Sequence, residues 1–258
     1  MSDGTAKAAK PAALTPDICV IGAGGIGIAL AIAAAAFGAP VVLIERDVIG
    51  GDQGPLAVRA LIEAGTRAQA LRDAGRFGLA AAEPQPNPGR IHDHVQRALA
   101  ADRANHTAER LATLGIIVIR GEARFTSRST VTVNGQPIKA RRFVIATGAR
   151  VASPAMAGLD AVPLLREADL AGLTRLPERP IVLGGAGAAL AQALHRLDCA
   201  ATLVCPEGLL AGHDAEAATI LRRRLLREGL ALHEDGEPLR AERTRSGLRL
   251  ILTSSSGE

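Results

Sequence analysis

The sequence feature that most constrains the fold is the long uncharged stretch between Asp17 and Glu45. It reads DICVIGAGGIGIALAIAAAAFGAPVVLIE, and a hydropathy window alone would assign it to a membrane span. Glycines interrupt it early, and Gly38 with Pro40 interrupts it late, so a single spanning helix would cross several helix breakers. Three short elements fit better: a buried strand at 18–21, a helix rich in small residues at 25–37, and a second buried strand at 41–44. The stretch therefore predicts a βαβ unit.

Within this unit, Gly22, Gly24 and Gly27 form a G-x-G-x-x-G on the strand-to-helix turn. Gly22 permits the tight turn, Gly24 lets the backbone approach a pyrophosphate, and Gly27 lets the helix pack closely on the strand. The helix N-terminus offers free N–H groups to the phosphate charge. Glu45 closes the second strand, where a carboxylate about 20 residues beyond the glycines accepts hydrogen bonds from ribose hydroxyls. A glycine-rich turn with an ordinary surface Glu is the alternative, but strand, helix, strand and acid together indicate dinucleotide binding.

Composition excludes several other classes of protein. The 258 residues are enough for about two domains, and 48% hydrophobic with 22% charged residues is typical of a globular protein. Trp and Tyr are absent, so aromatic side chains that stack on bases are scarce. The net charge of +4 is spread along the chain without a basic stripe, which argues against nucleic acid as a partner.

The cysteines and the N-terminal residues bear on the compartment. Cys19, Cys199 and Cys205 are an odd, scattered set without C-x-x-C or metal spacing, which suits a reducing cytoplasm. Residues 1–15 have no apolar region followed by a cleavage site, and we expect a disordered leader. The sequence thus predicts a cytoplasmic protein that is not a membrane protein.

Between the first unit and residue 150, the pattern predicts helices at 56–72 and 91–114, the second ended by Gly115. A buried strand is expected at 116–119, then an antiparallel meander at 123–125, 130–133 and 137–140 around the turn Asn134-Gly135, and a strand at 142–147. His92 and His94 point to different faces of their helix, so we expect no metal site there.

A second unit begins near Pro180 and repeats the opening pattern. A strand is expected at 181–183, a glycine turn at 184–187, a helix at 188–197 and a strand at 201–204. This copy is degenerate, because its glycines read G-G-A-G and give no G-x-G-x-x-G. Its second strand ends at Cys205 rather than at an acid, with Glu207 two residues later. A helix at 215–227, a strand at 230–233 and a final pair of strands through residue 252 complete the prediction.

The combination of VIGAGGIGIALAIAAAAFGAPVVLIE, GGD, GEARF, RRFVIATG and LAQALHRL resembles the pyridine nucleotide-disulfide oxidoreductases, in particular the mercuric reductase and dihydrolipoyl dehydrogenase branch. The resemblance spans residues 17 to about 232. It implies an α/β, Rossmann-like fold with a parallel sheet, helices, an antiparallel meander and two βαβ units. It also implies an FAD-binding domain at 16–150 and a degenerate, truncated NAD(P)-binding domain at 151–258.

The resemblance assigns residues to each cofactor. On the FAD side the glycines would face the pyrophosphate, Glu45 the adenosine ribose, Ala123 the adenine, and Thr147 with Gly148 the flavin. The implied FAD residues are Gly22, Ala23, Gly24, Gly25, Ile26, Gly27, Glu45, Arg46, Gly51, Asp52, Arg59, Ala123, Ala146, Thr147 and Gly148, and the nicotinamide residues are Gly184, Gly185 and Gly187. No catalytic and no metal-binding residue is expected.

The chain also departs from the family pattern. The family places a redox-active C-x-x-x-x-C after G-G-D and then a Lys beside the flavin, whereas here the segment from Gln53 to Arg59 is shorter, lacks Cys and has Arg59 in the Lys place. The nicotinamide-side turn is about two residues short, and Ala189 replaces its following acid. The family's closing FAD segment and dimerisation domain have no counterpart here.

Two functional hypotheses follow. In the first, the chain binds FAD and transfers hydride from NAD(P)H to it without a redox disulfide, with NAD(P)H binding weak or absent. In the second, it is a non-catalytic remnant or interaction subunit, in which a homodimer or a partner chain covers the exposed core edges.

Overall fold

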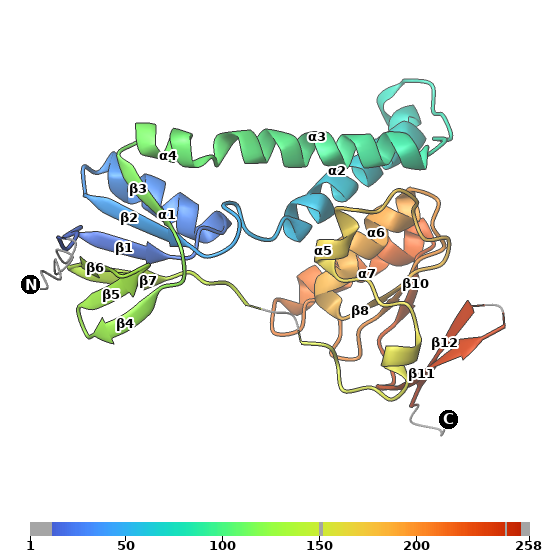
Figure 1. The fold of residues 1–258 in the computed structure, drawn as a ribbon. Coiled ribbons are helices and arrows are strands. Elements are labelled where there is room, and N and C mark those ends of the chain that lie inside the picture. Colours follow the sequence, from blue (N-terminus) through green and yellow to red (C-terminus); the bar gives the residue numbers. More distant parts are fainter. Residues whose placement is uncertain (1–11, 150–151, 246, 254–258) are drawn as a thin grey trace, which may run out of the picture. The chain divides into compact units, whose positions relative to one another are not determined.

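The computed structural model describes residues 12–149, 152–245 and 247–253 (Figure 1). Its contacts divide the chain into two compact units, each made of two separated stretches. The first unit comprises Met1–Asp52 and Ala100–Val151, and the second comprises Gln53–Leu99 and Ala152–Glu258. Residues 1–11 of the expected leader lie outside the described residues.

The first unit is built on a four-stranded parallel sheet with the strand order β3-β2-β1-β7. Its strands are β1 (Ile18–Ile21), β2 (Val41–Glu45), β3 (Ile116–Arg120) and β7 (Arg142–Ile145). Helix α1 (Gly25–Ala36) joins β1 to β2 and thereby completes the βαβ unit that the sequence predicted. The fold class is confirmed in this half of the chain.

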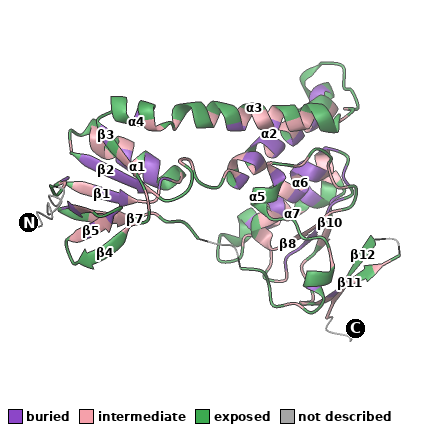
Figure 2. Cartoon of the chain, viewed as in Figure 1, coloured by how far each residue is buried: buried purple, intermediate pink, exposed green. Residues whose placement is uncertain are grey.

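Both faces of this sheet are covered, which explains why its strands read as continuous apolar runs. On one face, Val20 and Leu43 pack with Ile28 of α1. On the other face, Cys19 and Val42 pack against the meander formed by β4 (Arg124–Ser127), β5 (Thr130–Val133) and β6 (Gln136–Lys139). Figure 2 shows β2 as largely buried and β1 as partly buried and partly intermediate. Alternate residues of each strand therefore belong to different cores.

The meander is antiparallel, as expected, and its tip adopts the turn that its sequence indicates. Asn134 and Gly135 both have positive φ, 48° and 80°, which is the type I′ geometry favoured between twisted strands. Leu14, which the sequence placed within the leader, pairs with Ile138 of β6, and its N–H donates to the carbonyl oxygen of Pro137 at 3.1 Å. Ordered chain therefore begins before residue 16.

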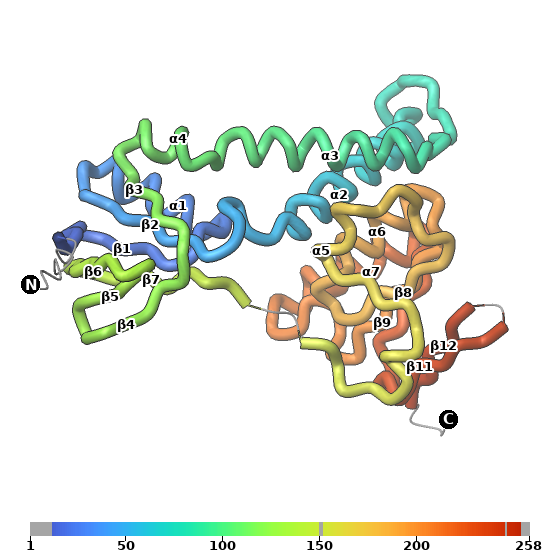
Figure 3. Tube along the Cα trace, viewed as in Figure 1, coloured from blue at the N-terminus to red at the C-terminus, as the bar shows by residue number. Residues whose placement is uncertain are grey.

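The second unit repeats the parallel arrangement on a smaller scale, with the strand order β10-β9-β8. The strands are β8 (Ile181–Leu183), β9 (Thr202–Val204) and β10 (Ala231–His233), and α6 (Ala188–Arg196) and α7 (Ala215–Glu228) connect them. A short 3-10 turn, η3 (Gly185–Gly187), precedes α6. An antiparallel hairpin of β11 (Pro238–Thr244) and β12 (Gly247–Leu252) follows. The second βαβ unit is thus also present (Figure 3).

Helix α2 (Gly54–Arg72) belongs to the second unit and packs on α6 and on the short α5 (Glu167–Leu170). The contact is close because small residues meet: a Cβ on Gly65 would lie 2.9 Å from the Cα of Ala193. The 3-10 helices η1 (Asp73–Phe77) and η2 (Leu159–Ala161) also lie in this unit. Residues 53–99 therefore group with the second unit, whereas the expected domain boundary at 150 placed them in the first.

The single helix expected at 91–114 is wrong, because the structure has two helices there. Helix α3 (Pro88–Asn105) ends before His106, and α4 (Ala108–Thr113) begins after Thr107. The physical reason is a helix cap: the Thr107 hydroxyl accepts a hydrogen bond from the N–H of Arg110 at 3.2 Å and starts a new helix.

The apolar stretch at 17–45 folds as strand, helix and strand rather than as one long helix. Within the described part of the chain, no helix is both long enough and apolar enough to cross a bilayer.

Candidate functional site

The candidate site of the first unit is the turn between β1 and α1. Gly22 adopts φ +104°, and its N–H donates to the carbonyl oxygen of Ile44 at 2.8 Å, which holds the turn at the carboxyl end of β2. A Cβ on Gly22 would lie 2.3 Å from the carbonyl oxygen of Ala146, and one on Gly27 would lie 1.9 Å from that of Gly22. Only glycine fits at these two positions.

Gly24 and Gly25 differ from their neighbours, because a Cβ added to either would meet nothing within 4 Å. Gly24 is the N-cap residue of α1, and no side chain caps the helix there. The helix N-terminus therefore has an open backbone surface, which suits the approach of an anion.

Glu45 fixes this turn from the end of β2. Its Oε2 accepts a hydrogen bond from the N–H of Ala23 at 2.6 Å, and its Oε1 accepts one from the N–H of Asp47 at 2.8 Å. The carboxylate is only partly buried, so its remaining lone pairs can accept further hydrogen bonds. Arg46 points to solvent and pairs with Asp47.

Two further segments that the sequence singled out meet the glycine turn. The Gly-Gly-Asp turn lies against it, because the N–H of Gly50 donates to the carbonyl oxygen of Ala23 at 2.8 Å and a Cβ on Gly51 would lie 3.0 Å from the Cα of Gly24. The chain after β7 also lies against it, since a Cβ on Gly22 would lie 2.3 Å from the carbonyl oxygen of Ala146 and one on Gly27 would lie 3.4 Å from the Cβ of Ala146. Sequence reasoning did not count Gly50 among the site residues, although its position in the G-G-D turn was the available signal.

The other predicted residues differ in their exposure and in the unit to which they belong. Ala123 is half-buried just beyond the end of β3, which pairs with β2 next to Glu45. Ile26, Asp52, Thr147 and Gly148 are exposed in the first unit. Arg59 is exposed on α2 in the second unit. Gln53, at the start of α2, has a buried Oε1 without a hydrogen-bond partner in the described residues.

The turn of the second unit is shorter, but it has an acid partner that the sequence analysis did not assign. Gly184 adopts φ +90°, and its N–H donates to the carbonyl oxygen of Val204 at 2.8 Å. The N–H of Gly185 donates to Oε1 of Glu207 at 2.6 Å. A Cβ on Gly187 would lie 2.4 Å from Cγ1 of Val182, so this glycine allows close packing on β8. Cys205, which the sequence placed where the acid belongs, is buried.

The histidines expected not to bind metal serve as hydrogen-bonding groups. Nδ1 of His92 lies 2.9 Å from the carbonyl oxygen of Leu173, and Nε2 of His94 lies 3.2 Å from that of Ala60. In the described ranges, no group of three or more His, Cys, Asp or Glu residues is arranged to hold a metal ion.

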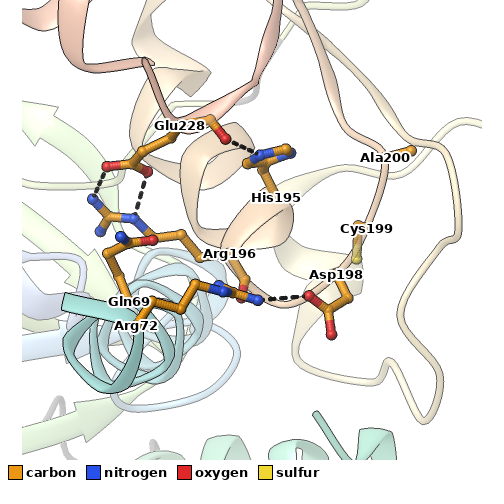
Figure 4. Close-up of a pocket in the computed structure, with 8 residues that line it drawn as sticks. All are labelled: Gln69, Arg72, His195, Arg196, Asp198, Cys199, Ala200 and Glu228. Atoms are coloured by element: carbon orange, nitrogen blue, oxygen red, sulfur yellow. Dashed lines mark hydrogen bonds and ion pairs between the residues drawn. The ribbon is translucent and has the colours of Figure 1, made fainter. Parts of the chain in front are cut away.

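A pocket of about 400 Å³ lies within the second unit, among α2, α6 and the end of α7 (Figure 4). Its charged groups are paired with one another. Arg196 forms two hydrogen bonds of 2.8 Å with Glu228, and Arg72 donates to Asp198 at 2.8 Å. We interpret the lining of this pocket as an ion-pair network that joins helices of the second unit, because Arg72 and Arg196 already pair with carboxylates.

The model of the pyridine nucleotide-disulphide oxidoreductase family matches residues 16–257. The mercuric reductase of Lysinibacillus sphaericus is 29% identical over 253 aligned positions, which cover 92% of this chain and 46% of that protein. The dihydrolipoyl dehydrogenase of Thermus scotoductus is 32% identical over 260 aligned positions, covering 94% and 54%. Among solved structures, the HOCl-induced flavoprotein disulfide reductase RclA from Escherichia coli matches with a TM-score of 0.69 at 20% identity, covering 92% of this chain and 53% of that one. The chain thus spans about half the length of these relatives.

Proposed function

Because the chain belongs to the pyridine nucleotide-disulphide oxidoreductase family, we propose that it is an FAD-binding flavoprotein that accepts hydride from NAD(P)H without a redox disulfide. One observation carries the proposal: the carboxylate of Glu45 holds the N–H of Ala23, while Gly24 next to it keeps an open backbone face. A pyrophosphate needs such an uncovered glycine face, and a ribose needs such a carboxylate.

Each group around this turn has a part in the proposal. The N–H groups at the start of α1 would hold the pyrophosphate, and the carboxylate of Glu45 would accept hydrogen bonds from the adenosine ribose. Ala123 would lie along the adenine, and Thr147 and Gly148 would offer backbone contacts on the flavin side. Bound FAD would supply the hydride-accepting chemistry, while the residues of this chain bind and orient it.

We propose that the second unit binds NAD(P)H weakly. The turn at 184–187 precedes a helix, but it is a single 3-10 turn, and Ala186 stands where an open glycine would let a pyrophosphate approach. Binding of NAD(P)H should therefore be weaker than low-micromolar.

Electrons should leave the flavin without a thiol intermediate. The position where the family has its first redox thiol is Gln53, whose amide cannot act as the nucleophile that disulfide exchange requires. Cys19, Cys199 and Cys205 are all buried and unpaired. We propose turnover with oxygen or a quinone as acceptor, in a reducing compartment such as the cytoplasm.

The test is a titration of the purified protein with FAD. We expect the flavin fluorescence to change, the melting temperature to rise, and Glu45→Ala to abolish both effects, because the ribose loses its acceptor. Glu109→Ala removes an exposed carboxylate from α4 of the first unit and serves as the control. If FAD changes neither the fluorescence nor the melting temperature, the proposal fails.

A second candidate function is that of a subunit that works only with a partner chain or a second copy. The observation in its favour is that large apolar side chains beside the site are exposed: Ile26 by 80%, Val48 by 66% and Ile145 by 68%. Light scattering at several concentrations tests this candidate, because a stable monomer at all concentrations would remove the case for self-association.

A further inference from the structure

The two glycine turns share one hydrogen-bonding device. In each, a glycine with positive φ donates its N–H to the carbonyl oxygen of the neighbouring strand at 2.8 Å: Gly22 to Ile44 and Gly184 to Val204. In each, the next residue donates its N–H to a glutamate carboxylate at 2.6 Å. The acceptors are Glu45 and Glu207, and both are 22 residues beyond their donor.

The two glutamates lie at different distances along the chain from the ends of their strands. In the first unit, Glu45 directly follows Ile44 at the strand end. In the second unit, β9 ends at Val204, and Cys205 with Pro206 carries the chain to Glu207. These two additional residues bring the Glu207 carboxylate back over the turn, 3.5 Å from where a Cβ on Gly184 would be. By its position at the end of β9, Cys205 corresponds to Glu45. By its hydrogen bond to the glycine turn, however, Glu207 is the residue that corresponds to Glu45.

Two further charged groups lie near Glu207, and they pair with each other. Glu234, after β10, accepts a hydrogen bond from the N–H of Leu209 at 3.1 Å and pairs with Arg222 at 2.7 Å. Burial, followed by the charges of Glu234 and Glu207, raises the pKa of the Cys205 thiol to about 11, with Arg222 acting in the opposite sense. Arg222 directs two nitrogens at Glu234, so the charges of these two residues compensate each other and the carboxylate of Glu207 remains.

We infer that Glu207 accepts the ribose hydroxyls of a nicotinamide dinucleotide and makes the second unit selective for NADH over NADPH. A carboxylate at this place accepts hydrogen bonds from a 2′-hydroxyl, as in dinucleotide-binding folds that take NAD. A 2′-phosphate would bring up to about two negative charges against the Glu207 carboxylate. The inference rests on the proposed function and adds the identity of the reductant.

The experiment compares the affinities of NADH and NADPH by calorimetry, in the FAD-loaded protein and up to millimolar concentrations. We expect NADH to bind more tightly than NADPH by about tenfold or more, the effect of one charge-assisted hydrogen bond. Glu207→Gln should reduce this ratio about tenfold, and Glu207→Arg should strengthen NADPH binding in absolute terms, a gain that misfolding cannot produce.

Two further variants isolate the cause. Glu242→Gln removes the same charge from the β11–β12 hairpin and should leave the ratio unchanged. Ala186→Gly opens the backbone face and should strengthen both nucleotides equally. If Glu207 only stiffened the turn, Glu207→Gln would lower the melting temperature and leave the NADH to NADPH ratio as it was.

The results of these experiments distinguish the inference about Glu207 from the proposal that the chain binds FAD. NADPH binding as tightly as NADH, a ratio unaffected by Glu207→Gln, or no binding of either nucleotide would overturn the inference about Glu207. With FAD still bound in those cases, the FAD-binding part of the proposed function would stand. Absence of FAD binding would instead refute that proposal, whatever the nicotinamide result.

Discussion

Gly24 and Gly27 are three residues apart on the same turn, and we expect their substitutions to have opposite consequences. A Cβ at Gly24 would meet nothing within 4 Å, whereas a Cβ at Gly27 would lie 1.9 Å from the carbonyl oxygen of Gly22. Gly24→Val should therefore fold and fail to bind FAD. Gly27→Ala should lower the stability of the fold itself.

The magnitudes follow from the geometry. Gly24 has φ −74° and ψ 176°, extended values that Val adopts readily, so we expect a change within about 1 kcal/mol. For Gly27→Ala, α1 must move off β1 by on the order of 1 Å, an overpacking cost of about 3 kcal/mol. Since 1 kcal/mol corresponds to about 2–4 °C in a chain of this size, the melting temperature should fall by about 6–12 °C.

The assay combines thermal melts followed by far-UV circular dichroism with FAD titration followed by flavin fluorescence. The chain has no Trp and no Tyr, so its own emission interferes little with the flavin signal. Gly24→Val should keep the melting temperature of the apo protein and weaken FAD at least about a hundredfold, equivalent to about 2.8 kcal/mol. Gly25→Ala, at the neighbouring open position, tests whether a single methyl group is tolerated.

If Gly24→Val bound FAD with wild-type affinity, the open face at Gly24 would not be where the cofactor approaches. A melting temperature for Gly24→Val as low as that of Gly27→Ala would also contradict the open surface at Gly24. In that case the surface at Gly24 would be occupied by chain rather than open.

Alkylation of the three buried cysteines should leave any NAD(P)H oxidation unchanged, because burial raises the pKa of each thiol to about 11 and keeps it protonated at neutral pH. Thiol-dependent turnover with lipoamide, glutathione disulfide or mercuric ion, above the oxygen background, would contradict this. Glu228→Gln should cost about 3 kcal/mol in urea unfolding, because Arg196 loses a buried partner, whereas Glu63→Gln in an exposed pair with Arg67 should cost under about 1 kcal/mol. Burial raises the pKa of Glu228, but hydrogen bonds and charges from Arg196 and Arg224 outweigh it and hold the pKa below its ordinary 4.5. A carboxyl with a lowered pKa stabilises the fold above its unfolded pKa and loses this as the pH falls through the folded value, so thermal melts should show wild type losing more stability than Glu228→Gln below pH 4.5.

The first βαβ unit could be predicted in detail because its signals are local. Continuous apolar runs, a glycine turn and a small-residue helix occur within 29 residues of uninterrupted chain, 17–45, and they require no knowledge of distant partners. The turn at Asn134 was predictable for the same reason, since its positive φ is set by residue type.

The break between α3 and α4 was missed because apolar positions continue at helical spacing on both sides of it. Leu99 and Leu111 are both buried, so periodicity alone gives no sign of an interruption. The available signal was Thr107, a good N-cap residue, with Glu109 in the first turn of the next helix. Capping competes with helix continuation, and here the cap prevails.

Glu207 was not assigned as the acid of the second turn because the sequence shows where β9 ends but not which later side chain folds back to the turn. Reading along β9 places Cys205 at the strand end, and only the three-dimensional path through Pro206 returns the carboxylate to the N–H of Gly185. A count from the donor would have found it, since the spacing equals that between Ala23 and Glu45. The packing of α2 on α6 could not be read at all, because Gly65 and Ala193 are far apart in sequence.

The placement of α2 constrains how such a protein can be divided. Each compact unit is assembled from two separated stretches, so neither can be exchanged as one contiguous segment. A recombinant fragment starting at residue 152 would keep the strands β8 to β10 but expose Ala193, which is 2% exposed in the intact chain, to water. Swapping this unit between relatives, by recombination or by engineering, would need two crossover points within the transplanted gene, one on each side of α2, in addition to the boundary near residue 152.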